Sequence, residues 1–251
     1  MSEINTETLR AQAHLSFNIK TVDALLPGFA LRNFAVLQGA LSALTLSMLL
    51  CVRAQLPPEE GGLGTNVVFI DGGNSFKLYV ASHIAQLYGL DAREVLERIF
   101  ISRAFTAYQM TNLILERLEG AVEEFNTKLV VVSDLPRLYL DEDVPEREAE
   151  EVFNQLTLYL SKFAKEKDIL AVATYLLPSP SNIRSSLLKE MLREQADVVA
   201  SIKPFAYTKR GERLQQFILE KHHLHELGGT SFSERLLHSS DSAEAETWGR
   251  L

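Results

Sequence analysis

The stretch Val36-Leu37-Gln38-Gly39-Ala40-Leu41-Ser42-Ala43-Leu44-Thr45-Leu46 decides the fold of this chain. It joins a short apolar run, 34–37, to a longer apolar run that ends at Pro57-Pro58. The first run predicts a buried strand, and the second predicts a helix over 40–56 that the two prolines stop. A strand that passes through a glycine into a helix is the beginning of a βαβ unit.

The same alternation of short apolar runs and longer amphipathic segments continues along the chain. It predicts strands over 66–71, 99–102, 129–132 and 169–175, and helices over 75–88, 91–98, 106–125, 145–163 and 183–194. Two more strands, 196–202 and 213–221, are expected to pair around the turn 207–212. We therefore expect an α/β core over 17–228 with a mainly parallel sheet, preceded by an arm, 1–16, and followed by a disordered tail, 229–251.

The bulk composition is that of a globular protein that can bury a full core. Of the 251 residues, 46% are hydrophobic and 23% are charged, and the net charge is -8. The longest apolar stretch, 37–52, is interrupted by polar residues and is too short to span a bilayer comfortably. The polar N-terminus lacks the pattern of a secretory signal, and the lone Cys51 fits a reducing compartment, so we expect a cytoplasmic location.

Several local strings, taken with the order of elements, resemble the RecA/RadA recombinase family, in particular its RadA-like branch and paralogues. The segment 21–29 is similar to the family's Leu-Asp-x-Leu-Leu-x-Gly-Gly string, and 69–76 stands where the family has Ile-Asp-Thr-Glu-Gly-Thr-Phe. The most specific match is Arg103-Ala104-Phe105-Thr106-Ala107-Tyr108-Gln109. The segment 129–134 resembles the Walker B strand. The resemblance implies a RecA-like fold of the P-loop NTPase type, with three layers, a mainly parallel central sheet and antiparallel closing strands.

The same resemblance locates a nucleotide site whose phosphate loop is degenerate here. A phosphate loop binds because glycines allow backbone N–H groups to converge on the phosphates, while a lysine neutralises their charge. The lysine position reads Thr45 or Leu44, depending on the alignment, so neither alignment provides a cation. The residues of this degenerate site are Gln38, Gly39, Ala40, Leu41, Ser42, Ala43, Leu44, Thr45, Asp71, Gly73, Gln109 and Asp134.

A second part of the catalytic apparatus is also missing. The family's Glu that activates the attacking water is replaced by Gly73, which has no carboxylate. Asp134 could organise a metal, although strand-end aspartates often only cap loops. Gln109 resembles the family's nucleotide sensor, and without nucleotide we expect it to make a helix-terminal hydrogen bond. We therefore expect no ATP hydrolysis and no bound cofactor; the alternative is weak binding of ATP and Mg²⁺ through the N–H groups of 40–43 and a lysine from elsewhere.

DNA contact is expected only locally, because the chain as a whole is acidic. The resemblance implies contact through two loops, of which 136–145 is acidic and 176–184 is mildly basic. Candidate DNA-binding residues in and after the second loop are Arg184, Lys189 and Arg193. A stronger basic cluster surrounds Tyr207 on the predicted hairpin, with Lys203, Lys209, Arg210 and Arg213, although a solvated turn explains it equally well.

Partner binding and metal binding have their own candidates. Recombinase cores assemble by adding a strand and a Phe anchor to the next protomer, and Phe17 could serve in this way. Apolar residues of the expected tail, Phe232, Leu236 and Trp248, could act as short recognition anchors. Three histidines lie close together at 222, 223 and 225, but they lack a nearby cysteine, and we expect no metal.

Three functions remain open at this point. The first is a RecA-fold paralogue that has lost hydrolysis and acts as a scaffold or mediator in DNA recombination and repair, in an oligomer with like or unlike RecA-like proteins. The second is a nucleotide-binding ATPase or sensor with a non-standard phosphate site. The third is a protein-interaction module without a DNA role.

Overall fold

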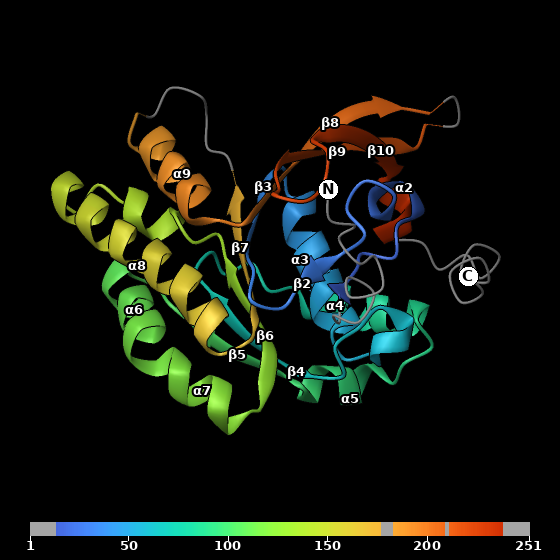
Figure 1. The fold of residues 1–251 in the computed structure, drawn as a ribbon, viewed down its shortest axis with the longest axis horizontal. Coiled ribbons are helices and arrows are strands. Elements are labelled where there is room, and N and C mark those ends of the chain that lie inside the picture. The colour runs from blue at the N-terminus through green and yellow to red at the C-terminus, as the bar shows by residue number, and fades with distance from the viewer. Residues whose placement is uncertain (1–13, 177–182, 209–210, 238–251) are drawn as a thin grey trace, which may run out of the picture.

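An eight-stranded sheet forms the middle of a three-layered molecule (Figure 1). The computed structural model describes residues 14–176, 183–208 and 211–237. The strands, in spatial order, are β10 (Gly228–Ser233), β9 (Arg213–Lys221), β8 (Val198–Tyr207), β3 (Phe34–Gly39), β7 (Leu170–Leu176), β6 (Thr127–Ser133), β4 (Asn66–Asp71) and β5 (Ile99–Arg103). Neighbouring strands from β8 to β5 are parallel, whereas β9 and β10 pair in the antiparallel sense. The predicted mainly parallel sheet with antiparallel closing strands is confirmed.

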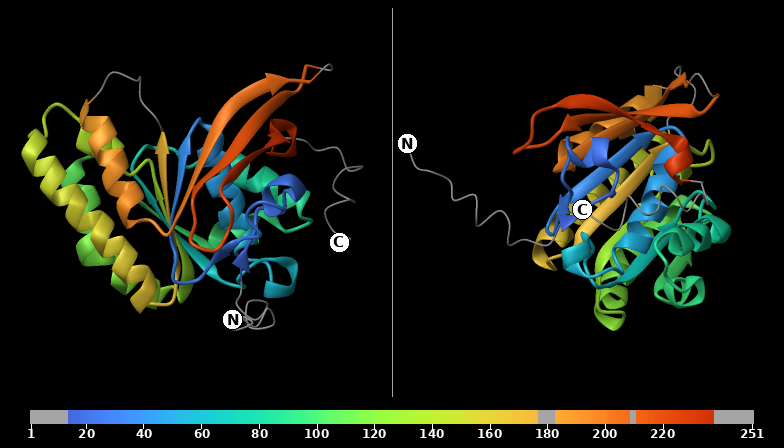
Figure 2. Two further views of the ribbon diagram at one scale, coloured as in Figure 1. Left: turned by 45° about the horizontal axis from the view of Figure 1, so that its top comes forward. Right: turned by 90° about the vertical axis from the view of Figure 1, so that its right-hand side faces the viewer.

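Helices cover both faces of the sheet, as both views in Figure 2 show. One face carries α3 (Ser42–Arg53), α4 (Leu78–Leu87) and α5 (Ala92–Glu97). The other face carries α6 (Ala107–Asn112), the π-helical turn η2 (Leu113–Arg117), α7 (Leu118–Glu124), α8 (Glu146–Glu166) and α9 (Ile183–Gln195). The long helix that the sequence predicts over 106–125 is thus one run of helix with a π-helical turn in its middle.

Two hydrophobic cores lie on either side of the sheet, and β3 contributes to both. Ala35 and Leu37 pack in the core beneath α3, whereas Phe34 and Val36 pack in the core beneath α8 and α9. A central parallel strand is buried on both faces, which is why this run is continuously apolar rather than alternating. The strand therefore carries Gly39 to the carboxyl edge of the sheet on a rigid support.

Short elements complete the structure around this core. The N-terminal part forms a small two-stranded sheet, β1 (His14–Leu15) with β2 (Phe29–Ala30), joined through α2 (Lys20–Asp23). Three 3₁₀ turns follow along the chain: η1 (Pro58–Glu60), η3 (Arg137–Leu140) and η4 (Glu234–Leu237). No helix within the described ranges is long and apolar enough to cross a membrane.

The ordered part of the chain extends further than the sequence suggested. We expected a disordered tail from residue 229, yet β10 adds to the edge of β9 and η4 follows it, so the described fold continues to Leu237. Residues 228–233 are rich in Ser and Gly, so the sequence did not predict that they form a strand, β10, whose Phe232 packs in the core. The expected arm likewise gives way at His14 to a strand of the small sheet; residues 1–13 and 238–251 lie outside the described part.

Candidate functional site

The connection between β3 and α3 is short. Only Ala40 and Leu41 separate the last residue of β3, Gly39, from the first residue of α3, Ser42. The helix begins two residues later than the sequence predicts. A phosphate loop needs several successive residues whose N–H groups converge on one anion, and the candidates here are the N–H groups of residues 40–43.

Two of the four N–H groups that could bind an anion at this turn are already used by the protein. The N–H of Ala40 donates to the carbonyl oxygen of Ile202 in β8 at 2.9 Å, and the N–H of Ala43 donates to the carbonyl oxygen of Ala40 at 2.9 Å. The turn is pressed against β8, because a Cβ added to Gly39 would lie 2.1 Å from the Ile202 oxygen. A phosphate at this position would have to break these contacts.

The first turn of α3 is part of the hydrophobic core. Ser42, Ala43 and Leu44 are buried, and Leu46 is fully buried beneath them. Of the two candidate lysine positions, Leu44 is buried and Thr45 is half-buried. The helix start therefore packs against the sheet and presents no cation at either position.

The side chain of Gln38, just before the turn, is turned away into a polar cluster beneath α9. Its Nε2 donates to Ser201 Oγ at 2.9 Å and to Glu220 Oε2 at 3.0 Å. Glu220 in turn pairs with Arg193 of α9 and accepts a hydrogen bond from Ser201. This cluster, which joins β3, β8, β9 and α9, holds the closing strands and α9 against the end of β3.

Asp71, at the end of β4, is fully buried and its oxygens are used within the protein. Oδ1 accepts from the N–H of Ser75 at 2.8 Å, and from the hydroxyls of Ser75 and Ser133 at 3.1 and 3.0 Å. Oδ2 accepts from the N–H of Phe76 and from Arg103, each at 3.3 Å. Burial alone would raise the pKa of this carboxyl, but the hydrogen bonds from Ser75, Phe76 and Ser133 outweigh it and lower the pKa. Asp71 thus caps the turn after β4 as a carboxylate.

Gly73, just after β4, and Asp134, just after β6, lie against one another. A Cβ added to Gly73 would lie 3.1 Å from Asp134 Cβ and 3.2 Å from Asp134 Oδ2. Asp134 Oδ1 accepts from the N–H of Leu176 at 3.2 Å, and Oδ2 lies 3.9 Å from Arg137. Burial raises the pKa of Asp134, while the Leu176 N–H and Arg137 oppose the rise. Asp134 therefore joins the end of β6 to the end of β7 by a hydrogen bond. This is a structural task of the kind that the sequence offered as the alternative to organising a metal.

Gln109 makes the helix-terminal hydrogen bond that the sequence predicts. Its Oε1 accepts from the N–H of Phe105 at 2.8 Å, and its own N–H donates to Thr106 Oγ1 at 3.2 Å. Both bonds close the first turn of α6. The side chain thereby stabilises the helix start on which it resides.

Among the cations proposed for DNA contact after β7, the two arginines make hydrogen bonds or ion pairs within the protein. Arg184 donates to the carbonyl oxygens of Asp141 and Val144 at 3.3 and 3.0 Å, and Lys189 is half-buried. Arg193 pairs with Glu190 at 3.6 Å and with Glu220. These contacts depend on the packing of α9 and could not be foreseen from the sequence; DNA contact by these residues stays a prediction.

The candidate DNA-binding cations on the β8–β9 hairpin are more exposed than those after β7. Lys203 is exposed near the end of β8, and Arg213 is 55% exposed while it pairs with Glu234 at 3.4 Å. Lys209 and Arg210 lie outside the described residues.

Two of the predicted partner anchors are buried within the chain itself. Phe17 is fully buried, with its ring 5.4 Å from that of Phe29 and 5.8 Å from that of Phe217, both edge to face. Phe232 is also buried, in the same core. The prediction that they anchor a partner is wrong for this fold, because the apolar character that suggested it serves the chain's own core. Leu236 lies in η4, and Trp248 lies outside the described residues.

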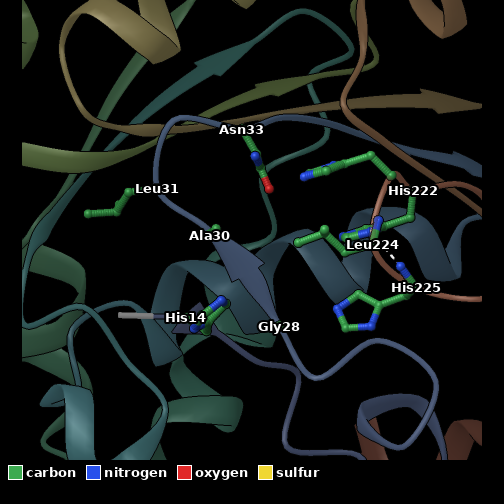
Figure 3. A pocket seen from close by; sticks show the side chains of 9 residues that line it. His14, Gly28, Ala30, Leu31, Asn33, His222, Leu224 and His225 are labelled. Carbon is green, nitrogen blue, oxygen red and sulfur yellow. Dashed lines mark hydrogen bonds between the residues drawn. The ribbon is translucent and has the colours of Figure 1, made fainter. Parts of the chain in front are cut away.

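A histidine cluster occupies a pocket that the sequence did not reveal (Figure 3). The pocket brings His14 and Asn33 from the N-terminal part to the loop with His222, His223 and His225. His222 Nδ1 accepts from the N–H groups of Leu224 and His225 at 3.0 and 3.1 Å, so this nitrogen shapes the loop. Burial, followed by the neighbouring His225 and His223, lowers the pKa of His222 to about 4. No metal-ligand set of three such side chains occurs within the ranges that the structure describes.

The comparison with known families agrees with the fold and with the order of its elements. The sequence model of the Rad51 family matches residues 20–181, which include the described elements from α2 to β7. The matched range includes the β3–α3 connection, Asp71, Gly73, Gln109 and Asp134. Since this match spans well over half of the chain, the protein belongs to the Rad51 family.

Proposed function

We propose that this chain is a noncatalytic member of the Rad51 family that acts as a scaffold or mediator in DNA recombination and repair. Membership of the family indicates the process, recombination and repair. The loss of catalysis rests on one observation above all, the two-residue connection between β3 and α3. A turn of that length, with the N–H groups of Ala40 and Ala43 bonded to protein carbonyls, offers no cradle for phosphates.

The surrounding carboxylates support the same proposal. Asp71 accepts five hydrogen bonds or ion-pair contacts from the protein, and Asp134 joins the ends of β6 and β7. Both side chains thus have structural tasks. Gly73 leaves no group to activate water, and its contact with Asp134 leaves little space for a larger side chain.

The alternative, an ATPase or sensor with a rebuilt phosphate site, required free N–H groups over 40–43 and a lysine from elsewhere. Two of those four N–H groups are occupied. Gln38, just before the turn, and Arg193 of α9 are both bound to Glu220. We therefore favour the noncatalytic function, in which the molecule contributes its surfaces to an oligomer with RecA-like proteins.

A substitution at Asp134 tests whether repair needs nucleotide chemistry from this chain. Asp134→Asn keeps an oxygen that can accept from Leu176 but removes the charge that a magnesium ion would need. In cells that depend on this protein, we expect survival after DNA damage to equal that of the wild type. Leu50→Asp, which places a charge in the fully buried core, serves as the control that must abolish survival.

Two results would contradict the proposal. One is a loss of survival with Asp134→Asn when the purified variant unfolds at the same temperature as the wild type. The other is ATP hydrolysis by the pure wild-type chain that this substitution abolishes. Normal survival of cells that lack the protein altogether would exclude the repair role and favour an interaction module without a DNA role.

A further inference from the structure

The pocket that brings four histidines together lies between two parts of the chain that are far apart in the sequence (Figure 3). His14 in β1, Gly28 just before β2 and Asn33 just before β3 come from the N-terminal part, and the other histidines come from the β9–β10 loop, 222–227. None of the described residues that line it is a carboxylate. We call it the histidine pocket. Several side chains of a type that ordinarily titrates near pH 6.5 thus lie together without a carboxylate in the wall.

The three imidazoles of the loop are close enough to repel one another when they are charged. The ring centroid of His222 lies 5.1 Å from that of His223, with the two ring planes only 3° apart. It lies 4.4 Å from the ring centroid of His225. At these distances one imidazolium strongly disfavours a second beside it. The arrangement of the loop is therefore suited to neutral rings.

The shape of the loop also depends on a nitrogen that carries no proton. His222 Nδ1 accepts hydrogen bonds from the N–H groups of Leu224 and His225, at 3.0 and 3.1 Å. An imidazole nitrogen accepts only while it is unprotonated, and in the imidazolium ion both ring nitrogens carry a proton. Protonation of His222 would therefore place a donor against two donors and remove the bonds that close this turn.

The one carboxylate that acts on His222 from another element is already used by other partners. Asp197, just before β8, favours the charged form of His222. Its Oδ1 pairs with Lys165 of α8 at 3.2 Å, and its Oδ2 accepts from the N–H of Phe34 at 2.9 Å. Asp197 thus offers only partial compensation for a positive charge in the loop.

The balance of these effects favours the neutral rings. Burial is the largest effect, and with the neighbouring His225 and His223 it lowers the pKa of His222 to about 4. The pKa of His225 is also lowered, first by burial and then by His14, which acts on it from the other side of the pocket, and by His223. A positive charge on the loop is therefore opposed both within the loop and from the N-terminal part.

We propose that the histidine pocket is an acid-sensitive contact, in which neutral imidazoles keep the β9–β10 loop closed against the N-terminal part and protonation of His222 releases it. The contribution of His222 is complete above about pH 6.5, where the ring is neutral in either state, and is lost as the pH falls toward about 4. This regulation lies beyond the proposed function and does not depend on it.

Nuclear magnetic resonance of the full chain, titrated from about pH 7.5 to about pH 4.5, tests the proposal. At the upper end, the ¹⁵N shifts of His222 should report a proton on Nε2 and none on Nδ1. The exchange rates of the Leu224 and His225 amides, corrected for the intrinsic effect of pH, should rise about 20-fold between pH 7 and pH 5, if release restores the ordinary titration of His222. The Gly28 amide resonance, across the pocket, should shift in the same pH range. The Ala40 amide, which bonds to Ile202, is the control and should exchange at an unchanged corrected rate.

Two variants separate protonation from other effects of acid. His222→Asn keeps an oxygen that can accept from the same two N–H groups, because Asn side chains bond the backbone two residues on, but it does not titrate in this range. Its loop amides and Gly28 should show no acid response. His14→Gln removes a basic group across the pocket and should raise the titration midpoint of His225. This second variant leaves the bonds of His222 intact, so it tests the pocket even if His222→Asn does not fold.

Three results would overturn the proposal. The first is titration of His222 at its ordinary midpoint of about 6.5 without any change in the exchange of the two loop amides. The second is an acid response of these amides in His222→Asn as large as in the wild type. The third is faster exchange of the loop amides while the Gly28 resonance stays in place, because the loop would then change shape without leaving the N-terminal part.

Discussion

Gly39 is the residue on which the shape of the β3–α3 connection depends. Its backbone has a φ of 121°, a conformation that L side chains rarely adopt. The Ile202 carbonyl oxygen stands where its Cβ would be and also accepts the hydrogen bond from Ala40. A single residue without a side chain thus allows the turn to close directly onto β8.

The substitution Gly39→Ala tests this account of the turn. The methyl group would meet backbone, which cannot move away as a side chain can, in addition to the strain of the positive φ. We expect a loss of more than about 3 kcal/mol in the free energy of unfolding, measured by urea titration. Gly64→Ala is the control, because Gly64 also has a positive φ but nothing within 4 Å, so it should lose only about 1–2 kcal/mol. Equal losses in the two variants would mean that Ile202 does not crowd Gly39.

Individual residues show which features of the site could be predicted from the sequence and which could not. The missing groups were visible, because neither Leu44 nor Thr45 is a cation and Gly73 is no carboxylate. The bond from the N–H of Ala40 to Ile202 was not, since it depends on the pairing of β3 with β8, two strands far apart in the sequence. A missing catalytic side chain can be read from a single residue of the sequence. Whether a backbone N–H group is already bonded depends on the register of two strands and cannot be read in this way.

At the scale of elements, the N-terminal segment 14–30 is bound to the core by one buried arginine. Arg53 of α3 is 2% exposed and donates to the carbonyl oxygens of Ser16 and Glu60, each at 2.7 Å. Phe17 fills the core beside it, and Asp23 Oδ1 is buried without a hydrogen-bond partner among the described residues. Burial is the main reason that the pKa of Asp23 rises to about 7, against the opposing charge of Arg53.

This raised pKa predicts a pH-dependent stability of the segment. Between its ordinary value near 3.8 and about 7, the Asp23 carboxyl is ionised in the unfolded chain but protonated in the folded protein. The contribution of Asp23 to stability is therefore largest at acidic pH and falls as the pH rises through this window. Asp23→Asn removes the dependence, so it should be more stable than the wild type at pH 8 by more than about 1 kcal/mol and nearly equal to it at pH 4.

Urea unfolding at these two pH values measures the effect, with the exposed Glu59→Gln as a control that should show no such difference. A stability difference between Asp23→Asn and the wild type that does not change with pH would contradict a raised pKa of the half-buried Asp23.

Elements were easiest to predict where their pattern was strong. β9 spans Arg213–Lys221 as predicted, and α8 begins directly after Pro145. β10 was missed because its sequence, Gly-Gly-Thr-Ser-Phe-Ser, has little β propensity and becomes a strand only through pairing with β9. Phe17 was assigned to a partner because nothing in a single apolar residue distinguishes an intermolecular anchor from an intramolecular one.

At the scale of the whole molecule, the chain has the fold of the Rad51 family, and several residues at the carboxyl edge of its sheet are bonded to other parts of the protein. The parallel strands carry Gly39, Asp71 and Asp134 to the same edge, where an α/β sheet usually binds its ligand. Each of these residues instead shapes a turn or joins two strands.

Isothermal titration calorimetry of the full chain with millimolar ATP and Mg²⁺ tests the central claim most directly, because it measures binding whether or not hydrolysis follows. We predict no saturable heat and no change in the unfolding temperature at the same concentration, since a ligand that binds only the folded state would raise it. One-to-one binding with a Kd below about 1 mM, reduced by Asp134→Asn, would contradict the claim that the β3–α3 connection no longer holds a nucleotide.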